Sequence, residues 1–185
     1  MKNKHSKKVS CADNQQERLI GWITGFVDGE GCFSIGLVKQ PNKKETQRTR
    51  KGYKTGYQVF HEFSVTQGES SLSSLEILKD FFGIGNIYIN KRYDNHKEHL
   101  YRYTVRKRED LVNIIIPFFK KAKLKTSKLD NFNKFVQCIE IVFKGDHLSN
   151  DGLIEILKIT EQMNHKKSRK DLIRILRYHM SESNN

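Results

Sequence analysis

The chain has 185 residues and carries 34 Lys and Arg against 21 Asp and Glu, a formal net charge of +13. This length suits one main domain with a small extension, and so strong a positive charge indicates a polyanionic partner, either nucleic acid or an anionic membrane. The longest apolar stretch, residues 111–119, contains Asn113 and Pro117 and is too short to span a bilayer. Nucleic acid is therefore the favoured partner, and no membrane partner is expected.

The N-terminus and the cysteines exclude several other classes. Residues 1–11 contain four lysines and no apolar h-region, so we expect a disordered basic tail rather than a signal peptide. Cys11, Cys32 and Cys138 lie far apart without a C-x-x-C pair, which argues against a zinc knuckle or a disulfide framework and indicates a reducing, intracellular compartment. Because no Cys/His ligand spacing occurs either, any bound metal should be a hard cation with oxygen ligands.

Hydrophobic periodicity predicts helices and strands in the order αββαββα, an α+β fold. The expected elements are a helix at 14–28, strands at 32–40 and 57–67, a helix at 69–82, strands at 84–91 and 100–107, a helix from 109 that Pro117 interrupts, and a helix at 127–143. Two short amphipathic helices should follow. We therefore divide the chain into a basic tail (1–13), a main domain (14–145) and a C-terminal helical extension (146–185).

The first predicted helix ends in the sequence LIGWITGFVDGEG, residues 19–31. Gly21 and Gly25 fall on one helical face. Each glycine inside a helix lowers the stability of the helix by about 1 kcal/mol relative to alanine, so we expect an interaction that compensates for this loss. Close packing against another helix supplies one. That helix could belong to a second copy of the chain, in which case Gly21 and Gly25 would form a dimer seam that also includes Trp22 and Thr24.

Two acids, Asp28 and Glu30, lie where this helix is expected to end. The helix dipole makes that position unfavourable for a carboxylate, and a bound cation would reverse the effect. Carboxylates and a free backbone carbonyl are ligands that Mg²⁺ or Ca²⁺ prefers, and such a cation can activate water for phosphodiester hydrolysis. The same residues are also typical of a glycine-terminated helix with solvated acids, and the pattern alone leaves both interpretations open.

The segment ITGFVDGEG, residues 23–31, resembles the LAGLIDADG motif of the homing endonucleases, with Gly25, Asp28, Gly29 and Gly31 in register. The αββαββα order resembles that family over residues 14–143. The resemblance implies a curved antiparallel sheet that forms a DNA-binding saddle. It also implies that Glu30 binds metal with help from the Gly29 carbonyl, whereas Asp28 braces the helix. The expected metal is Mg²⁺, with Mn²⁺ able to replace it and Ca²⁺ able to support binding.

Two further catalytic candidates follow from the same resemblance. Gln67 ends the second predicted strand in VTQ and would hold the water shell around the metal. Lys125, in LKTSK, would stabilise charge or help to activate water, although Lys123 and Lys128 compete for this role. Both roles suit a polar amide and a cation near a phosphate. Surface solvation is the alternative for each residue.

The two predicted hairpins are rich in basic, amide and aromatic side chains, which can contact phosphates and base edges when a β-ribbon enters the major groove. The candidate DNA-binding residues are Lys39, Gln40, Lys43, Lys44, Arg48, Arg50, Tyr53, Lys54, Tyr57, Gln58, Tyr88, Asn90, Arg92, Tyr101, Tyr103 and Arg106. Within the strand 57–67, the parity that contains Gln58, Glu62 and Ser64 is the polar one and should face DNA, with Phe60 as an exception.

Because the chain contains one such motif and two DNA strands must be cut, the resemblance implies a homodimer that makes a double-strand break in a long, near-palindromic DNA target by metal-dependent hydrolysis. The rival hypotheses are a maturase-like protein of the same fold that binds intron RNA as a splicing cofactor, and a non-catalytic DNA-binding regulator. An intact Glu30 favours the nuclease. The lysine- and asparagine-rich composition suggests an AT-rich source, a phage or an organelle such as a chloroplast or mitochondrion.

Overall fold

A computed structural model describes residues 11–41, 52–91, 98–163 and 168–183. The elements are α1 (Cys11–Glu30), β1 (Gly31–Lys39), β2 (Tyr57–Gly68), η1 (Glu69–Ser71), α2 (Leu72–Phe82), β3 (Asn86–Asn90), β4 (Leu100–Val105), α3 (Arg108–Asp110), η2 (Leu111–Ile115), α4 (Ile116–Ala122), α5 (Lys128–Lys144), η3 (Asp146–Leu148), α6 (Asn150–Thr160) and α7 (Lys170–Ser183). The predicted order and the two C-terminal helices are confirmed. Within these ranges, no helix combines the length and the apolar character that a membrane crossing requires.

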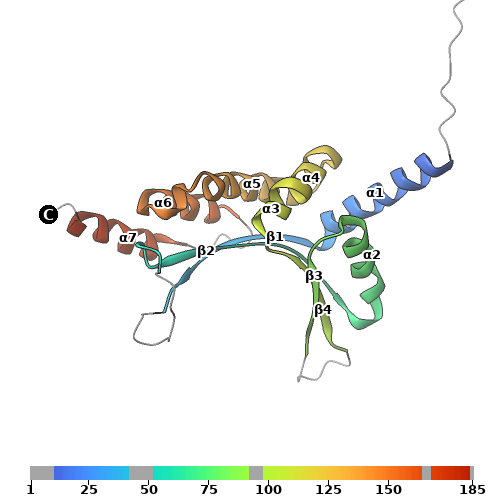
Figure 1. The fold of residues 1–185 in the computed structure, drawn as a ribbon, viewed down its shortest axis with the longest axis horizontal. Helices are drawn as coiled ribbons and strands as arrows, with labels where there is room; N and C mark the ends of the chain where they lie inside the picture. Colours follow the sequence, from blue (N-terminus) through green and yellow to red (C-terminus); the bar gives the residue numbers. More distant parts are fainter. Residues whose placement is uncertain (1–10, 42–51, 92–97, 164–167, 184–185) are drawn as a thin grey trace, which may run out of the picture.

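The four strands form one antiparallel sheet in the order β1-β2-β4-β3. Figure 1 shows this sheet as an arch, with α3 to α6 over its convex face, α1 and α2 at one end, and no helix of the described ranges over the concave face. The expected curved sheet of an α+β fold is therefore confirmed. β2 and β4 occupy its centre, so their outward-facing side chains form the middle of the concave face.

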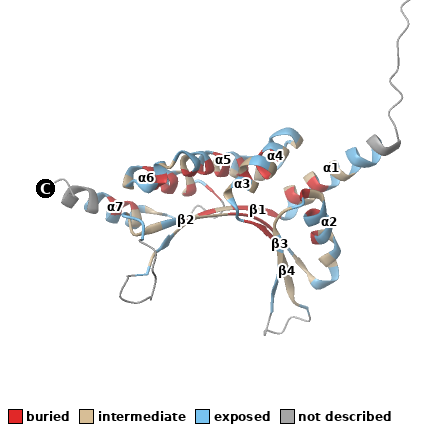
Figure 2. Cartoon of the chain, in the orientation of Figure 1, coloured by how far each residue is buried: buried red, intermediate tan, exposed pale blue. Residues whose placement is uncertain are grey.

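An aromatic cluster fastens the helices to the convex face. The Phe33 ring on β1 lies 5.1 Å from Phe63 on β2 and 5.1 Å from Phe132 on α5, measured between ring centroids. Phe119 and Phe135 complete the cluster, and all five rings are fully buried. The buried residues lie between sheet and helices in Figure 2. Leu153, Ile156 and Leu157 of α6 join the same core.

The segment around Pro117 stays helical, which corrects the predicted interruption. Leu111–Ile115 forms a π-helical turn, and α4 follows with the proline in its first turn. Proline lacks a backbone N–H, and its ring clashes with the carbonyl four residues earlier in a regular α-helix. The wider turn relieves that conflict, so the chain changes its helical geometry without leaving the helix.

α1 extends two residues beyond its predicted end, and the chain passes directly from the last helical residue, Glu30, to the first strand residue, Gly31. Gly31 is buried, and a Cβ atom there would lie 2.6 Å from the backbone oxygen of Val27 and 2.5 Å from its Cγ1 atom. A backbone oxygen cannot rotate away as a side chain can. The direct passage from helix to strand therefore requires glycine at position 31.

Two histidines are enclosed beneath the helices. The Nδ1 atoms of His61 on β2 and His147 in η3 are buried and have no hydrogen-bond partner in the described part of the chain. Burial first, and then the positive charge of Arg108, lower the pKa of each imidazole below its ordinary value of 6.5. The folded protein therefore holds both rings in the neutral form more strongly than the unfolded chain does.

We expect Gly31→Ala to lower the free energy of unfolding by about 1–3 kcal/mol, because the added methyl group overpacks the site against a fixed carbonyl. Gly36→Ala, in the same strand, is the matched control, since nothing lies within 4 Å of a Cβ there. The control should stay within about 1 kcal/mol of the parent chain. Urea denaturation of the three proteins makes the comparison, and equal stability of both variants would contradict the steric argument.

We expect the free energy of unfolding to fall as the pH drops below about 6.5, because the unfolded chain then binds protons that the two folded histidines resist. Above that pH their contribution is fully present. His61→Asn removes one of the two groups and should make the decline with pH shallower. Urea denaturation at a series of pH values measures both slopes, and identical slopes for the parent and the variant would refute the assignment to His61.

Candidate functional site

The C-terminal end of α1 presents an acid to solvent. Glu30 is the last helical residue, and both Glu30 and Gly29 are exposed. The carbonyls at this end are the negative pole of a helix of 20 residues. Carboxylate and carbonyl oxygens therefore gather at one point of the surface, which is a setting that attracts a cation.

Asp28 holds this end of the helix to the loop between α4 and α5. Its carboxylate accepts hydrogen bonds from the backbone N–H of Lys125 at 2.8 Å and from the Thr126 hydroxyl at 2.7 Å. Desolvation alone would raise the pKa of Asp28, but these hydrogen bonds and the nearby Lys128 charge outweigh it and lower the pKa. Asp28 therefore stays ionised and acts as a brace, with its oxygens engaged by the protein.

Lys128 brings a positive charge to the same helix end. Its Nζ atom donates to the carbonyl oxygen of Gly29 at 3.2 Å and also to the carbonyl oxygen of Gly31. The predicted lysine, Lys125, is exposed and contacts Asp28 through its backbone N–H. Lys128 and Lys123 were the two alternatives to Lys125 for the predicted catalytic lysine. The Gly29 carbonyl oxygen therefore already accepts from one cation, which a metal ion bound there would have to share or displace.

Gln67 lies on β2 near this end of α1. The strand register pairs Val65 with Gly31, so Gln67 continues β2 past the point where β1 begins and runs beside the end of the helix. Its side chain is partly exposed, and on the other side it pairs with Tyr101 of β4. Gln67 therefore lies at the same end of the sheet as Glu30 and Gly29, and the register gives its side chain the parity of Val65 and Tyr101, on the helix-covered side.

The oxygen donors at this site fit a hard cation but do not enclose one. Mg²⁺ and Ca²⁺ take about six to eight oxygen ligands. Among the described residues, no group of three or more His, Cys, Asp or Glu could hold a metal ion. Glu30 and the Gly29 carbonyl could supply only part of such a shell, and water, phosphate oxygens or a second copy of the site would have to complete it.

One face of α1 is bare. Gly21, Gly25 and Gly29 follow each other at four-residue intervals, all three are exposed, and nothing lies within 4 Å of a Cβ placed on any of them. Trp22 borders this face, stacks on Phe26 with 5.0 Å between ring centroids, and remains 40% exposed. Thr24 turns partly away and donates its hydroxyl to the Ile20 carbonyl. The face permits backbone-to-backbone contact with another helix.

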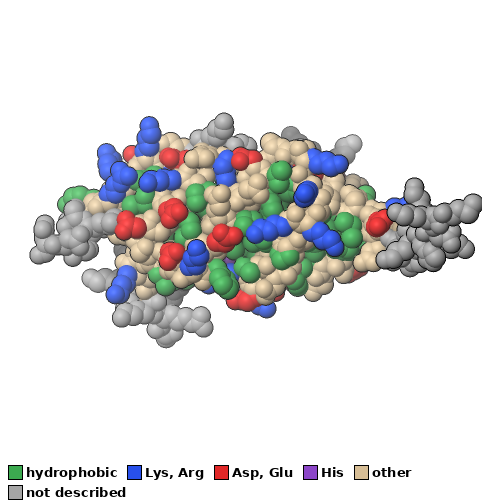
Figure 3. Space-filling model, turned by 90° about the horizontal axis from the view of Figure 1, so that it is seen from above, with side chains coloured by type: hydrophobic (Ala, Val, Ile, Leu, Met, Phe, Trp, Pro, Cys, Tyr) green, Lys and Arg blue, Asp and Glu red, His purple; other side chains and the backbone are tan. Residues whose placement is uncertain are grey.

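The predicted polar parity of β2 lies on the concave face of the sheet. Val59, Phe63 and Val65 are buried in the core, so the alternate residues from Gln58 to Thr66 point the other way. Phe60 is no exception, because the Arg106 guanidinium covers its ring. Figure 3 views the opposite, helix-covered side, where Asp and Glu side chains are scattered among Lys and Arg.

The predicted DNA-binding residues divide into three groups. The first group has the strand parity of the concave face: Gln58, Tyr88, Asn90 and Arg106. The second group lies near the loop that joins β1 to β2: Lys39, Gln40, Tyr53 and Lys54. There the amide oxygen of Gln40 accepts a hydrogen bond from the backbone N–H of Tyr53 at 2.9 Å. Lys43, Lys44, Arg48, Arg50 and Arg92 lie outside the described residues. Tyr57, Tyr101 and Tyr103 form the third group.

The placement of these three tyrosines corrects the prediction. Tyr103 is fully buried and donates its hydroxyl to the Ile84 carbonyl at 3.0 Å, so it cannot reach DNA. Tyr57 and Tyr101 share the parity of core residues and pack against the core. The prediction was wrong for Tyr103 because composition identifies a hairpin as aromatic without showing which face each side chain takes.

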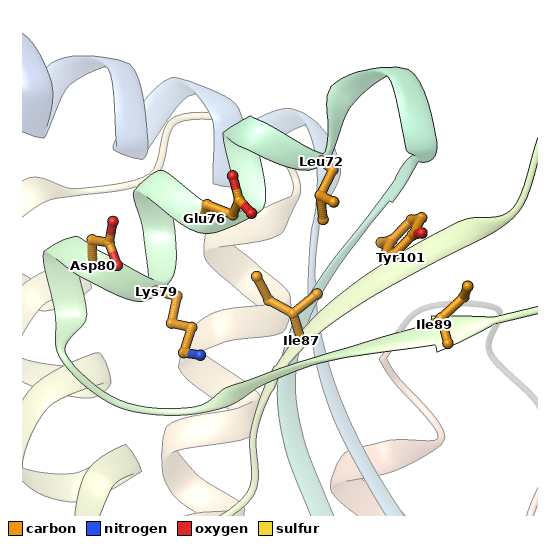
Figure 4. A pocket seen from close by; sticks show the side chains of 7 residues that line it. All are labelled: Leu72, Glu76, Lys79, Asp80, Ile87, Ile89 and Tyr101. Atoms are coloured by element: carbon orange, nitrogen blue, oxygen red, sulfur yellow. The ribbon is translucent and has the colours of Figure 1, made fainter.

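A hollow of about 540 Å³ lies between α2 and the strands β3 and β4. Figure 4 shows Tyr101 in it beside Leu72 and Ile87, with Glu76 and Lys79 on the helical side. This hollow is on the helix-covered side of the sheet, away from the concave face. Tyr101 therefore faces the helix-covered side of the sheet, where it lines this hollow.

Glu62 and Arg102 were not among the candidate DNA-binding residues that the sequence pattern predicted. Glu62 is completely buried in the middle of β2 and binds both Arg102 and Arg106. A charged residue among apolar neighbours of a strand was the available signal, and it was read only as part of the polar parity.

Known proteins match this chain over most of its length. The LAGLIDADG endonuclease family model matches residues 23–139. "Probable intron-encoded endonuclease 2" of Neurospora crassa is 31% identical over 144 residues, which is 77% of this chain and 28% of that protein. The homing endonuclease I-TnaI is 35% identical with a TM-score of 0.65, over 88% of this chain and 96% of that one.

I-SmaMI, solved bound to an uncleaved DNA target in the presence of calcium ions, is 34% identical with a TM-score of 0.67, over 82% of this chain and 46% of that one. It has also been solved bound to cleaved DNA. This chain spans only about a quarter of the curated relatives, 28% and 25% of the first two. The family match nevertheless covers the end of α1, the whole sheet and most of α5, so this chain belongs to the LAGLIDADG endonuclease family.

Proposed function

We propose that this protein is a site-specific homing endonuclease that makes a double-strand break in a long, near-palindromic DNA target by metal-dependent phosphodiester hydrolysis. The observation that carries the proposal is the exposed Glu30 carboxylate at the end of α1, where the helix passes directly into the first strand of the curved sheet. A duplex in the saddle would bring its phosphates to the carboxylate. The DNA-bound structures of I-SmaMI support double-stranded DNA as the partner.

Glu30 and the Gly29 carbonyl would hold Mg²⁺, with Mn²⁺ as a substitute, and Ca²⁺ should support binding. When bound, such a cation lowers the pKa of water and stabilises the charge on the leaving oxygen. Gln67 would orient solvent at the same end of the sheet. Lys125 was assigned to charge stabilisation from the sequence, and the carbonyl contacts of Lys128 make it a second candidate for that role. The calcium-containing structure of I-SmaMI supports a divalent cation.

The working unit is proposed to be a homodimer joined through the bare face of α1. Each protomer has one exposed Glu30 and only a partial ligand shell, whereas cutting two DNA strands needs two sites. Packing two α1 helices along Gly21, Gly25 and Gly29 would place the two Glu30 carboxylates near the shared axis. This arrangement would also bury the exposed part of Trp22.

The intron-encoded relatives support an intron as the source of this reading frame. Together with the lysine- and asparagine-rich composition, they lead us to propose an organellar genome as its location. Intron homing is then the biological role of the cleavage.

We expect Glu30→Gln to lower the cleavage rate by at least about 100-fold, the order of loss seen when one charge-stabilising group is removed. DNA binding in Ca²⁺ should be retained, because the substitution keeps the shape and removes a charge that repels phosphate. The matched control is Glu17→Gln, an exposed glutamate on the same helix away from the motif.

The target is first found by incubating the chain with a randomised duplex library, with Mg²⁺ or with a chelator, and sequencing every new end. Cleavage and gel-shift assays on that target then compare the variants. A Glu30→Gln protein that cuts at the parent rate would contradict the assignment of Glu30 as the metal-binding catalytic acid. Absence of new ends from the parent protein, together with tight binding to intron RNA, would favour the maturase hypothesis instead.

We expect Gly25→Leu to dissociate the dimer, because the side chain would hold the two helices apart. The protomer itself should not suffer, since nothing lies within 4 Å of a Cβ at this position and leucine is a better helix former than glycine by about 1 kcal/mol. Ser73→Leu, which adds the same apolar group to an exposed position on α2, serves as the control. Sedimentation equilibrium should give one chain mass of 21.7 kDa for Gly25→Leu and twice that mass for the control. A dimeric Gly25→Leu protein would show that the interface does not lie on this face of α1.

A further inference from the structure

A buried carboxylate lies in the middle of the concave face. Glu62 is 0% exposed, yet it belongs to the β2 parity that points away from the core. Its Oε1 atom accepts from Nη2 of Arg102, and its Oε2 atom accepts from Nε of Arg106. The two arginines remain 42% and 59% exposed. The carboxylate is therefore covered by the two cations that it binds.

This arrangement restricts both arginines. The Nη2 atom of Arg102 also donates to the Ser64 hydroxyl at 3.0 Å, so Arg102 has two protein acceptors. Arg106 is bound through Nε on one side, and its guanidinium carbon lies 5.5 Å from the centroid of the Phe60 ring. A long arginine side chain on an open surface normally samples many rotamers. Here its planar group is held between a carboxylate and an aromatic face.

The contacts leave the outer edge of the Arg106 guanidinium available. Binding through Nε uses one edge of the planar group, whereas the two Nη atoms at its tip take no part in that contact. A guanidinium presented in this way can donate two parallel hydrogen bonds to O6 and N7 of guanine in the major groove. The Glu62 charge also offsets part of the charge of the two arginines, so the cluster suits directional recognition better than general attraction to phosphate.

We propose that Glu62 is a positioning residue that fixes Arg106, with Arg102 beside it, to read a guanine in each half of the DNA target. This inference rests on the proposed function and adds a determinant of specificity to it. Prior ordering of the arginine lowers the entropy cost of making its base contact. An unordered arginine at this position would contact neighbouring phosphates and bases with less discrimination.

Selection by binding tests this inference separately from cleavage. The full chain is incubated with a randomised duplex library in Ca²⁺, and bound DNA is recovered and sequenced for the parent protein, Glu62→Gln, Arg106→Lys and Lys54→Ala. The parent should enrich guanine at one position in each half-site. Glu62→Gln and Arg106→Lys should each reduce the preference at that position by roughly 5- to 150-fold, the range for one bidentate base contact, and leave other positions unchanged.

Lys54→Ala is the matched control, because Lys54 is an exposed cation at the hairpin end, outside the cluster. It should weaken binding to all sequences and lower the slope of log affinity against log salt by about 1, with no change in base preference. Thermal melting checks that each variant is folded. Where Glu62→Gln fails to fold, Glu62→Asp replaces it, because it keeps the charge and draws the arginines back by one methylene group. It should reduce the same preference.

A folded Glu62 variant that retains the parent's full base preference overturns the inference, and so does an unchanged preference in Arg106→Lys. The proposed function fails in a different way, since the parent protein itself would then enrich no sequence. An affinity loss in Glu62→Gln that is equal for all sequences would show that Glu62 supports only the surface, and it would also overturn the positioning role.

Discussion

The direct passage from α1 to β1 is the constraint on which the rest of the structure depends. No loop separates Glu30 from Gly31, so the end of a 20-residue helix and the start of the first strand share one rigid junction. The junction exists because Gly31 tolerates a contact with Val27 that any side chain would block. The position of Glu30 relative to the sheet is therefore set by backbone geometry, and a flexible loop would not hold it as well.

Segments that are distant in the sequence also contact this junction. The carboxylate of Asp28 anchors the loop that contains Lys125 and Thr126, and the ammonium of Lys128 reaches back to the carbonyls beside Glu30. The aromatic core keeps α5, which begins at Lys128, pressed against the sheet. Packing on the convex face thus helps to determine where charges lie at the Glu30 end of α1.

The two faces of the sheet have separate tasks, and strand alternation keeps them apart. Core residues such as Phe63 and Tyr103 pack against the helices, while the alternate residues of β2 and β4 point the other way and form the concave face. The middle of the concave face has its own ordered contacts, because Glu62 on β2 binds both Arg102 and Arg106 there. A surface of freely moving cations would attract DNA equally well, but it would discriminate poorly between sequences.

The sequence by itself determined the order of elements, the family and the acid at the motif end, since these depend on local periodicity and on the short segment from Ile23 to Gly31. Tertiary structure decided the rest. It placed Tyr103 in the core and Arg106 on the open face, although both come from one polar, aromatic strand segment, because register and sheet curvature select the face. It also brought Lys128 to Gly29 across a sequence separation of 99 residues, and Glu62 to Arg102 across a separation of 40. Such contacts arise from folding geometry, and no local pattern in the sequence contains it.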